Sequence, residues 1–177
     1  GDIGTDVVPN TKRTLVRDLL HQLLTENEQR AKDNGIGFNV CWQDANMTAD
    51  ADHKRLRLMV KRLLLYVMSL SVDGAVKIDV ASVFDHQLGD MLTIMIERSE
   101  VDVSQEALDE MMCPFSKAGN SLLHRGEENS DIGVAIAIEL ANEMGGALKA
   151  KSIDNKCVQF AFSVRLYDHE NQDVELF

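Results

Sequence analysis

Hydrophobic side chains recur at two different spacings along the chain, and these spacings divide it into predicted helices and strands. Residues 14–33, 52–71 and 132–144 carry apolar side chains three and four positions apart, as amphipathic helices with one buried face do. The buried faces are Leu15, Leu19, Leu20, Leu23 and Leu24; Leu56, Met59, Val60, Leu63, Leu64, Val67 and Met68; and Ile132, Ala135, Ile136, Leu140 and Met144. Asn34-Gly35 ends the first helix and Gly145-Gly146 ends the third, because these residues favour a helix C-terminus.

The remaining apolar segments are short and read as strands. They are residues 38–42, 77–83, 91–96, 147–152 and 157–165. Residues 84–90 are expected to join the second and third strands, and Asp154-Asn155 to turn between the last two. Residues 43–51 are expected to be a polar loop. Together these elements predict an α/β two-layer sandwich, with a mixed, mostly antiparallel sheet covered on one face by about three helices.

Residues 103–146 hold the most informative order of signals. Ser104 is placed to cap a short helix, and Glu106 lies in its first turn, where the helix dipole favours an acid. Pro114 stops that helix, because the residue before proline avoids the α region. Residues 116–130 are polar and glycine-containing, so we expect a mobile loop before the last helix resumes.

Composition narrows the class of protein. The chain has 177 residues, 45% hydrophobic residues and a net charge of −11, as expected for one soluble domain with a sizeable core. This charge argues against a binder of nucleic acid or anionic membrane, which would need a basic face. It also suits a nucleotide poorly unless the pocket is locally basic. No apolar segment is long enough to span a membrane, so any membrane attachment would come from parts of a parent receptor outside this sequence.

The cysteines indicate a reducing compartment. Cys41, Cys113 and Cys157 are odd in number, scattered, and without the spacing of a metal site. We therefore expect them to be reduced and mostly buried, in a cytoplasmic protein or the cytoplasmic part of a membrane-bound sensor. No metal site and no catalytic residue are expected.

Four short segments in the C-terminal half resemble one family in order and spacing. They are Val103-Ser-Gln-Glu106, Met111-Met112-Cys113-Pro114-Phe115, Asp131-Ile132-Gly133-Val134-Ala135-Ile136 and Asn142-Glu143-Met144-Gly145-Gly146. This order is similar to the catalytic and ATP-binding domain of sensor histidine kinases, the Bergerat (GHKL) fold shared with gyrase-type ATPases. The resemblance implies a domain over residues 14–166 with a lid loop at 116–130, an N-terminal linker at 1–13 and a C-terminal linker or tail at 167–177.

The resemblance also implies an ATP pocket, and its helical N box departs from the family pattern. Asp52, Arg55 and Leu56 match the opening of that box. The family's first asparagine is Arg62 here, its magnesium-binding asparagine is Tyr66, and its lysine is Ser69. A magnesium ion takes oxygen ligands such as Asn, Asp or water, so a neutral tyrosine is a poor substitute.

The two glycine boxes depart as well. In the first box, Arg98 occupies the position of the family aspartate that accepts a hydrogen bond from the adenine amino group, and a guanidinium has no acceptor atom. Glu100 and Asp102 occupy the positions of the family's glycines. In the second, the phosphate-cradling positions are Asn129, Asp131 and Gly133, and only the last keeps its glycine. Asp131 would repel phosphate, although it would also serve as a helix N-cap.

The first hypothesis is therefore a degenerate member of the family. It would act in a two-component phosphorelay as a pseudokinase, an adaptor or a docking module, with ATP binding lost or very weak and no cofactor. Its partners would be a histidine-bearing hairpin or a receiver domain. None of the five histidines has the context of a phospho-accepting residue, so that hairpin, and any homodimer formed through such N-terminal helices, lies outside this sequence.

Two other hypotheses stay open. One is a working sensor histidine kinase domain with a divergent pocket, binding ATP and magnesium through main-chain contacts and Arg98, Lys117 and Arg125. The other is a similar fold with an unrelated binding role. The side chains of Tyr66 and Arg98 discriminate between the first hypothesis and the kinase: they fill the pocket if it is degenerate and turn outward if it is open.

Overall fold

One five-stranded sheet forms the first layer of the molecule, in the order β2-β4-β5-β7-β6. The strands are β2 (Ile36–Trp42), β4 (Gly74–Asp85), β5 (Gly89–Ser99), β6 (Ala147–Ile153) and β7 (Cys157–Arg165). β2 runs parallel to β4, and every other pair of neighbours is antiparallel. The computed structural model describes residues 13–113 and 130–167 of the chain.

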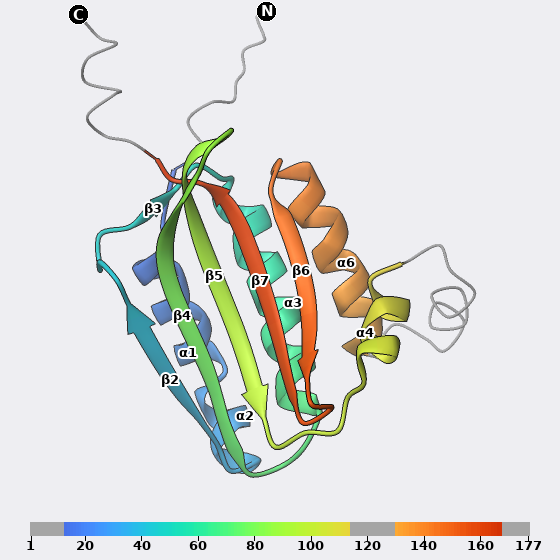
Figure 1. Cartoon of the computed structure of the whole chain (residues 1–177). Coiled ribbons are helices and arrows are strands. Elements are labelled where there is room, and N and C mark those ends of the chain that lie inside the picture. Colours follow the sequence, from blue (N-terminus) through green and yellow to red (C-terminus); the bar gives the residue numbers. More distant parts are fainter. Residues whose placement is uncertain (1–12, 114–129, 168–177) are drawn as a thin grey trace, which may run out of the picture.

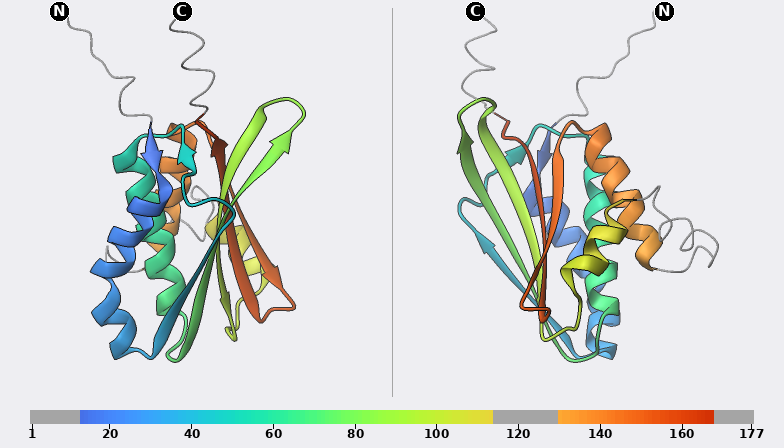
Figure 2. Two further views of the ribbon diagram at one scale, coloured as in Figure 1. Left: turned by 90° about the vertical axis from the view of Figure 1, so that its left-hand side faces the viewer. Right: turned by 45° about the vertical axis from the view of Figure 1, so that its right-hand side comes forward.

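Helices α1 (Val16–Glu26), α3 (His53–Ser69) and α6 (Ser130–Glu143) form the second layer, on one face of the sheet (Figure 1). The opposite face bears no helix in the described part of the chain (Figure 2). This architecture confirms the predicted α/β sandwich with its mostly antiparallel mixed sheet. Within the described ranges, no helix is long and apolar enough to cross a membrane.

The core lies between the layers because alternate strand residues point toward the helices. The buried strand residues include Leu92, Ile94 and Ile96 on β5, and Val158, Phe160, Phe162 and Val164 on β7. They meet the helix residues Leu19, Leu20, Leu23, Leu56, Met59, Leu63 and Leu64, all of which are buried. The two spacings read from the sequence therefore point to the same core.

Local chemistry fixes the ends of several elements, and the Ser104 cap and the last turn were predicted. The Asp52 carboxylate caps α3 by accepting a hydrogen bond from the Arg55 backbone N–H (3.1 Å). The Ser104 hydroxyl caps α4 (Gln105–Met111) in the same way, accepting from the Ala107 N–H (3.1 Å). Asp154 and Asn155 both have positive φ, which confirms the predicted turn between β6 and β7.

The prediction of a single first helix over residues 14–33 is wrong. The helix is split into α1 and α2 (Glu28–Asp33), and Asn27 lies at the break. The Asn27 side chain is buried and donates from Nδ2 to the Leu23 carbonyl (2.8 Å). This bond satisfies a carbonyl at the end of α1, so the break carries no unpaired group there.

The prediction of a polar loop over residues 43–51 is also wrong. β3 (Thr48–Ala49) pairs antiparallel with β1 (Thr14–Leu15), forming a small second sheet. Met47, Thr48, Ala49 and Ala51 are buried, because this segment closes one end of the helical layer.

Two further expectations have mixed outcomes. All three cysteines are free, but Cys41 and Cys113 are exposed and Cys157 is half-buried, so the expectation of burial is wrong. Pro114 and the expected lid at 116–130 lie outside the described residues, except for the start of α6.

Candidate functional site

The predicted magnesium position, Tyr66, points from α3 into the core. Its side chain is 3% exposed. The ring packs edge to face against Phe160 of β7, with 5.7 Å between centroids and 88° between planes. This geometry is a favourable aromatic contact, and it places the ring between the helical layer and the sheet.

Ser69, the predicted lysine position, belongs to the last turn of the same helix. Its hydroxyl donates to the Tyr66 carbonyl (2.6 Å). Such a bond serves the helix C-terminus, where carbonyls lack intrahelical partners. Serine has a short, neutral side chain, so it cannot offer the positive charge that a lysine would bring to a phosphate group.

Arg62 and Gly133 are brought together where α3 packs on α6. A Cβ added to Gly133 would lie 3.3 Å from Arg62 Cδ and 3.7 Å from Arg62 Cβ. Gly133, which the resemblance assigns to the second glycine box, therefore accommodates the stem of Arg62. Arg62 Nε is buried and has no hydrogen-bond partner among the described residues.

Arg98, the predicted adenine position, is fully buried at 0% exposure. Its guanidinium donates from Nη1 to the Val67 carbonyl (2.8 Å), and from Nη2 to the carbonyls of Ser71 (2.8 Å) and Asp73 (3.2 Å). These acceptors lie in the last turn of α3 and just beyond it, where a helix dipole favours a cation. Burial lowers the pKa of Arg98, and the nearby Glu100 opposes that shift.

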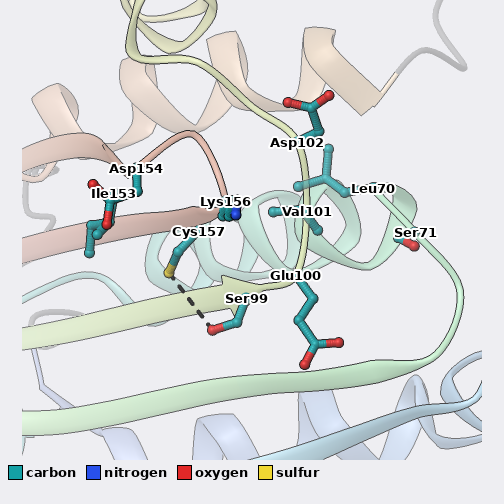
Figure 3. A pocket seen from close by; sticks show the side chains of 10 residues that line it. All are labelled: Leu70, Ser71, Ser99, Glu100, Val101, Asp102, Ile153, Asp154, Lys156 and Cys157. Atoms are coloured by element: carbon teal, nitrogen blue, oxygen red, sulfur yellow. Dashed lines mark hydrogen bonds between the residues drawn. The ribbon is translucent and has the colours of Figure 1, made fainter.

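Glu100 and Asp102, the predicted glycine positions, are exposed. They point in opposite directions from the segment that follows β5, on an open hollow of about 690 Å³ (Figure 3). Val101 and Val103 are buried, and their N–H groups donate to the carbonyls of Lys156 (3.1 Å) and Asn155 (3.2 Å). The segment is thus tied to the β6–β7 turn with its acidic side chains facing solvent.

The backbone at Glu100 keeps the conformation of a glycine. Its φ is +61°, in the left-handed region that L-residues other than Asn and Asp seldom adopt. The sequence resemblance assigns this position to the first glycine of the adenine-binding box. The backbone therefore has a conformation that suits glycine, while this position carries a charged side chain.

The remaining predicted positions are only partly described. Asn129 lies outside the described residues, and for Asp131 the structure describes the helical backbone alone. The described positions do not all meet in one cavity: Tyr66 and Arg98 are buried in the core, and only Glu100 and Asp102 line the open hollow. In the described ranges, no group of three or more His, Cys, Asp or Glu side chains is placed to hold a metal ion.

The sequence contained a signal for the burial of Arg98 that residue-type reasoning missed. Leu92, Ile94 and Ile96 alternate along β5, and Arg98 is the next residue in that series. Strand periodicity therefore places it on the core face. Phe160, the contact of Tyr66, follows the same alternation on β7 but has no local link to α3.

The structure of this chain is similar to solved structures of histidine kinases. The catalytic domain of histidine kinase ThkA matches with a TM-score of 0.69 and 16% identity, covering 86% of this chain and 93% of that one. Histidine kinase AdeS of Acinetobacter baumannii matches with a TM-score of 0.66 and 15% identity, covering 92% and 70%. Full-length ShkA in complex with AMPPNP matches with a TM-score of 0.66 and 17% identity, covering 93% of this chain and 32% of that one.

No protein-family model and no curated protein matches the sequence. The structural matches nevertheless cover 86–93% of this chain. The chain therefore has the histidine-kinase ATPase-type fold.

Proposed function

We propose that this chain is a degenerate histidine-kinase-like domain that docks proteins in a two-component phosphorelay, as a pseudokinase or adaptor, with ATP binding lost or very weak. The observation that carries the proposal is the inward position of Tyr66 and Arg98. Tyr66 is 3% exposed and Arg98 is 0% exposed, at the two positions where the family places its magnesium and adenine contacts.

Tyr66 opposes nucleotide binding in two ways. Its neutral phenol is a poor magnesium ligand compared with the asparagine of the family. Its ring would have to leave Phe160 to make room for phosphates. Exposing a large buried aromatic side chain costs about 1.5–3 kcal/mol, so ATP would bind against that cost.

Arg98 opposes adenine binding. A guanidinium only donates hydrogen bonds, so it repels an adenine amino group that a carboxylate would accept. Freeing it would also break its bonds to the carbonyls of Val67, Ser71 and Asp73. Hydrogen bonds to a charged group contribute about 1.5–3 kcal/mol each, so the side chain is held firmly in place.

The fold supports the phosphorelay part of the proposal. The similar domains of ThkA and AdeS belong to histidine kinases. The resemblance of the sequence to that family implies histidine-bearing hairpins and receiver domains as partners. A domain that keeps the scaffold without the nucleotide retains its surfaces for such partners.

The test is nucleotide binding by calorimetry and thermal shift, using millimolar ATP and AMPPNP with and without magnesium. Full-length ShkA is the positive control, because it was crystallised with AMPPNP. We expect no heat and no thermal shift for this chain, since a ligand that binds the native state raises its melting temperature by mass action.

A magnesium-dependent shift like that of ShkA would overturn the proposal. The working-kinase alternative would then hold, and Tyr66→Ala would locate the site. Removing the ring would change the affinity if phosphates bind beside α3.

A further inference from the structure

The β4–β5 hairpin carries several exposed apolar side chains. Four large hydrophobic side chains of the described residues are well exposed, and three of them lie at this hairpin: Val83 (54%), Phe84 (64%) and Leu88 (52%). The hairpin projects past the other strands of the sheet (Figure 2). Because successive strand residues alternate between faces, Val83 and Phe84 expose apolar surface on opposite sides of the hairpin. A strand added at the edge of β4 would contact apolar side chains on both of its faces.

The β4 arm of this hairpin is an open sheet edge. The ladder with β2 ends at Trp42, opposite Val80. Gln43 then continues it briefly: its N–H donates to the Val80 carbonyl (2.9 Å), and its side-chain Oε1 accepts from the Ser82 N–H (2.7 Å). Beyond Ser82, no described strand lies along this side of β4.

Strand geometry gives the direction of the next backbone groups. Val80 and Ser82 both use polar backbone groups on the β2 side, so Phe84, two residues further, presents its N–H and C=O to the same side. The other arm is covered, because the Leu166 N–H donates to the Asp90 carbonyl (3.0 Å). An open edge with unpaired groups is a template for another strand.

Charge indicates what kind of strand fits. Asp85 lies between Phe84 and Leu88, and Asp90 follows the turn; neither forms an ion pair within the described residues. The Asp85 carboxylate accepts from the N–H groups of Gln87 (2.8 Å) and Leu88 (2.9 Å), which fixes its place in the turn. The whole chain has a net charge of −11, so a second copy would be repelled and a basic segment attracted.

We propose that the edge from Ser82 to Asp85 binds an extended, basic segment of a partner protein, which adds to the sheet as a strand. Its alternate side chains place an apolar residue beside Phe84 and a lysine or arginine beside Asp85, because strand neighbours on one face contact each other. This surface is separate from the degenerate pocket, so the inference stands whether or not ATP binds.

The test is a titration of the whole chain with two decapeptide probes, in which NMR measures the amide chemical shifts of the protein. One probe alternates valine with lysine, and the other alternates valine with glutamate. We expect the lysine peptide to shift amides of residues 82–86 and the glutamate peptide to have no such effect.

Three variants locate the binding. Phe84→Pro removes the edge N–H at a position where an edge strand tolerates proline, and should weaken binding about tenfold or more. Phe84→Ser keeps the edge but removes the ring, and should weaken it by about threefold or more. Val72→Ser is the matched control, because Val72 is 61% exposed but lies outside the hairpin.

Several outcomes would overturn the inference. They are equal binding of both peptides, no shifts at residues 82–86, and binding that Phe84→Pro leaves intact in a variant whose melting temperature shows that it is folded. Sedimentation that reveals a dimer lost in Phe84→Pro would assign the edge to a second copy instead.

Discussion

At the scale of single residues, Glu100 is the clearest departure from what its backbone favours. Its φ of +61° suits glycine, and its side chain faces solvent. A left-handed conformation costs an L-residue about 1–2 kcal/mol. Glu100→Gly should therefore raise the free energy of unfolding by about 1 kcal/mol relative to Glu100→Ala, as measured by urea denaturation.

The alanine variant is the control for charge. Both substitutions remove the carboxylate that acts on Arg98, and only glycine relieves the backbone. Equal stability of the two variants would mean that the left-handed conformation carries no cost at this position.

Cys157 gives a prediction at the same scale. Burial raises the pKa of its thiol, with a smaller opposing contribution from the hydrogen bond of Ser99. A raised pKa lowers the thiolate fraction at any pH below it, and thiolate is the reactive form. At pH 8 we expect Cys157 to react with a disulfide reagent more slowly than the exposed Cys41 and Cys113.

The reagent's absorbance gives the rates, and Cys157→Ser should remove the slow phase. The slow rate should rise with pH toward the raised pKa. Three equal rates, or a fast phase lost in Cys157→Ser, would contradict the assignment.

At the scale of elements, the turn between α6 and β6 depends on two adjacent glycines for different reasons. A Cβ on Gly146 would lie 2.5 Å from Phe162 Cε1 and 2.7 Å from the Ser163 carbonyl oxygen. A Cβ on Gly145 would meet open space, but its φ is +71°. Gly146→Ala should cost about 3 kcal/mol through overpacking, and Gly145→Ala about 1 kcal/mol through backbone strain.

Urea denaturation of the two variants measures this difference. Gly145→Ala is the matched control, since it makes the same chemical change one residue away. Equal losses would show that β7 shifts to accommodate the new methyl group.

The elements that local signals determine were predictable from the sequence. Periodic helix faces, the caps Asp52 and Ser104, and the Asp154-Asn155 turn each depend on residues close in the chain. The strands of β1 and β3 were missed because two-residue strands show no period, and only their distant pairing defines them. The break at Asn27 was missed because the leucine pattern lies entirely before Asn27 and the next expected stop was Asn34-Gly35, so no local signal marked an earlier end.

For the candidate site, the resemblance singles out residues but does not indicate the contacts that they make. The resemblance located Tyr66 and Arg98 as departures from the family. The contacts that these side chains make, with Phe160 and with the carbonyls beyond α3, join segments far apart in the sequence. Such contacts follow from how α3 packs on the sheet, which residue types alone do not specify.

At the scale of the whole molecule, added salt has two opposite effects on stability: it screens the repulsion due to the net charge, and it weakens the ion pairs. The chain carries −11, and repulsion among its carboxylates opposes the compact state. Its described ion pairs are mostly exposed, including Arg55 with Asp52 and Glu143, and exposed pairs contribute little. Repulsion should therefore dominate, and salt should stabilise the fold.

Salt shortens the screening length from about 30 Å at 0.01 M to about 3 Å at 1 M, so it weakens long-range repulsion more than contact pairs. At pH 7 we expect added sodium chloride to raise the melting temperature by about 2–4 °C. A gain of about 1 kcal/mol in the free energy of unfolding gives a shift of this size in a chain of this length. The control is the same titration near the isoelectric point of 4.8, where the gain should vanish. A melting temperature that falls with salt at pH 7 would mean that the ion pairs, and Arg55 foremost, outweigh the net charge.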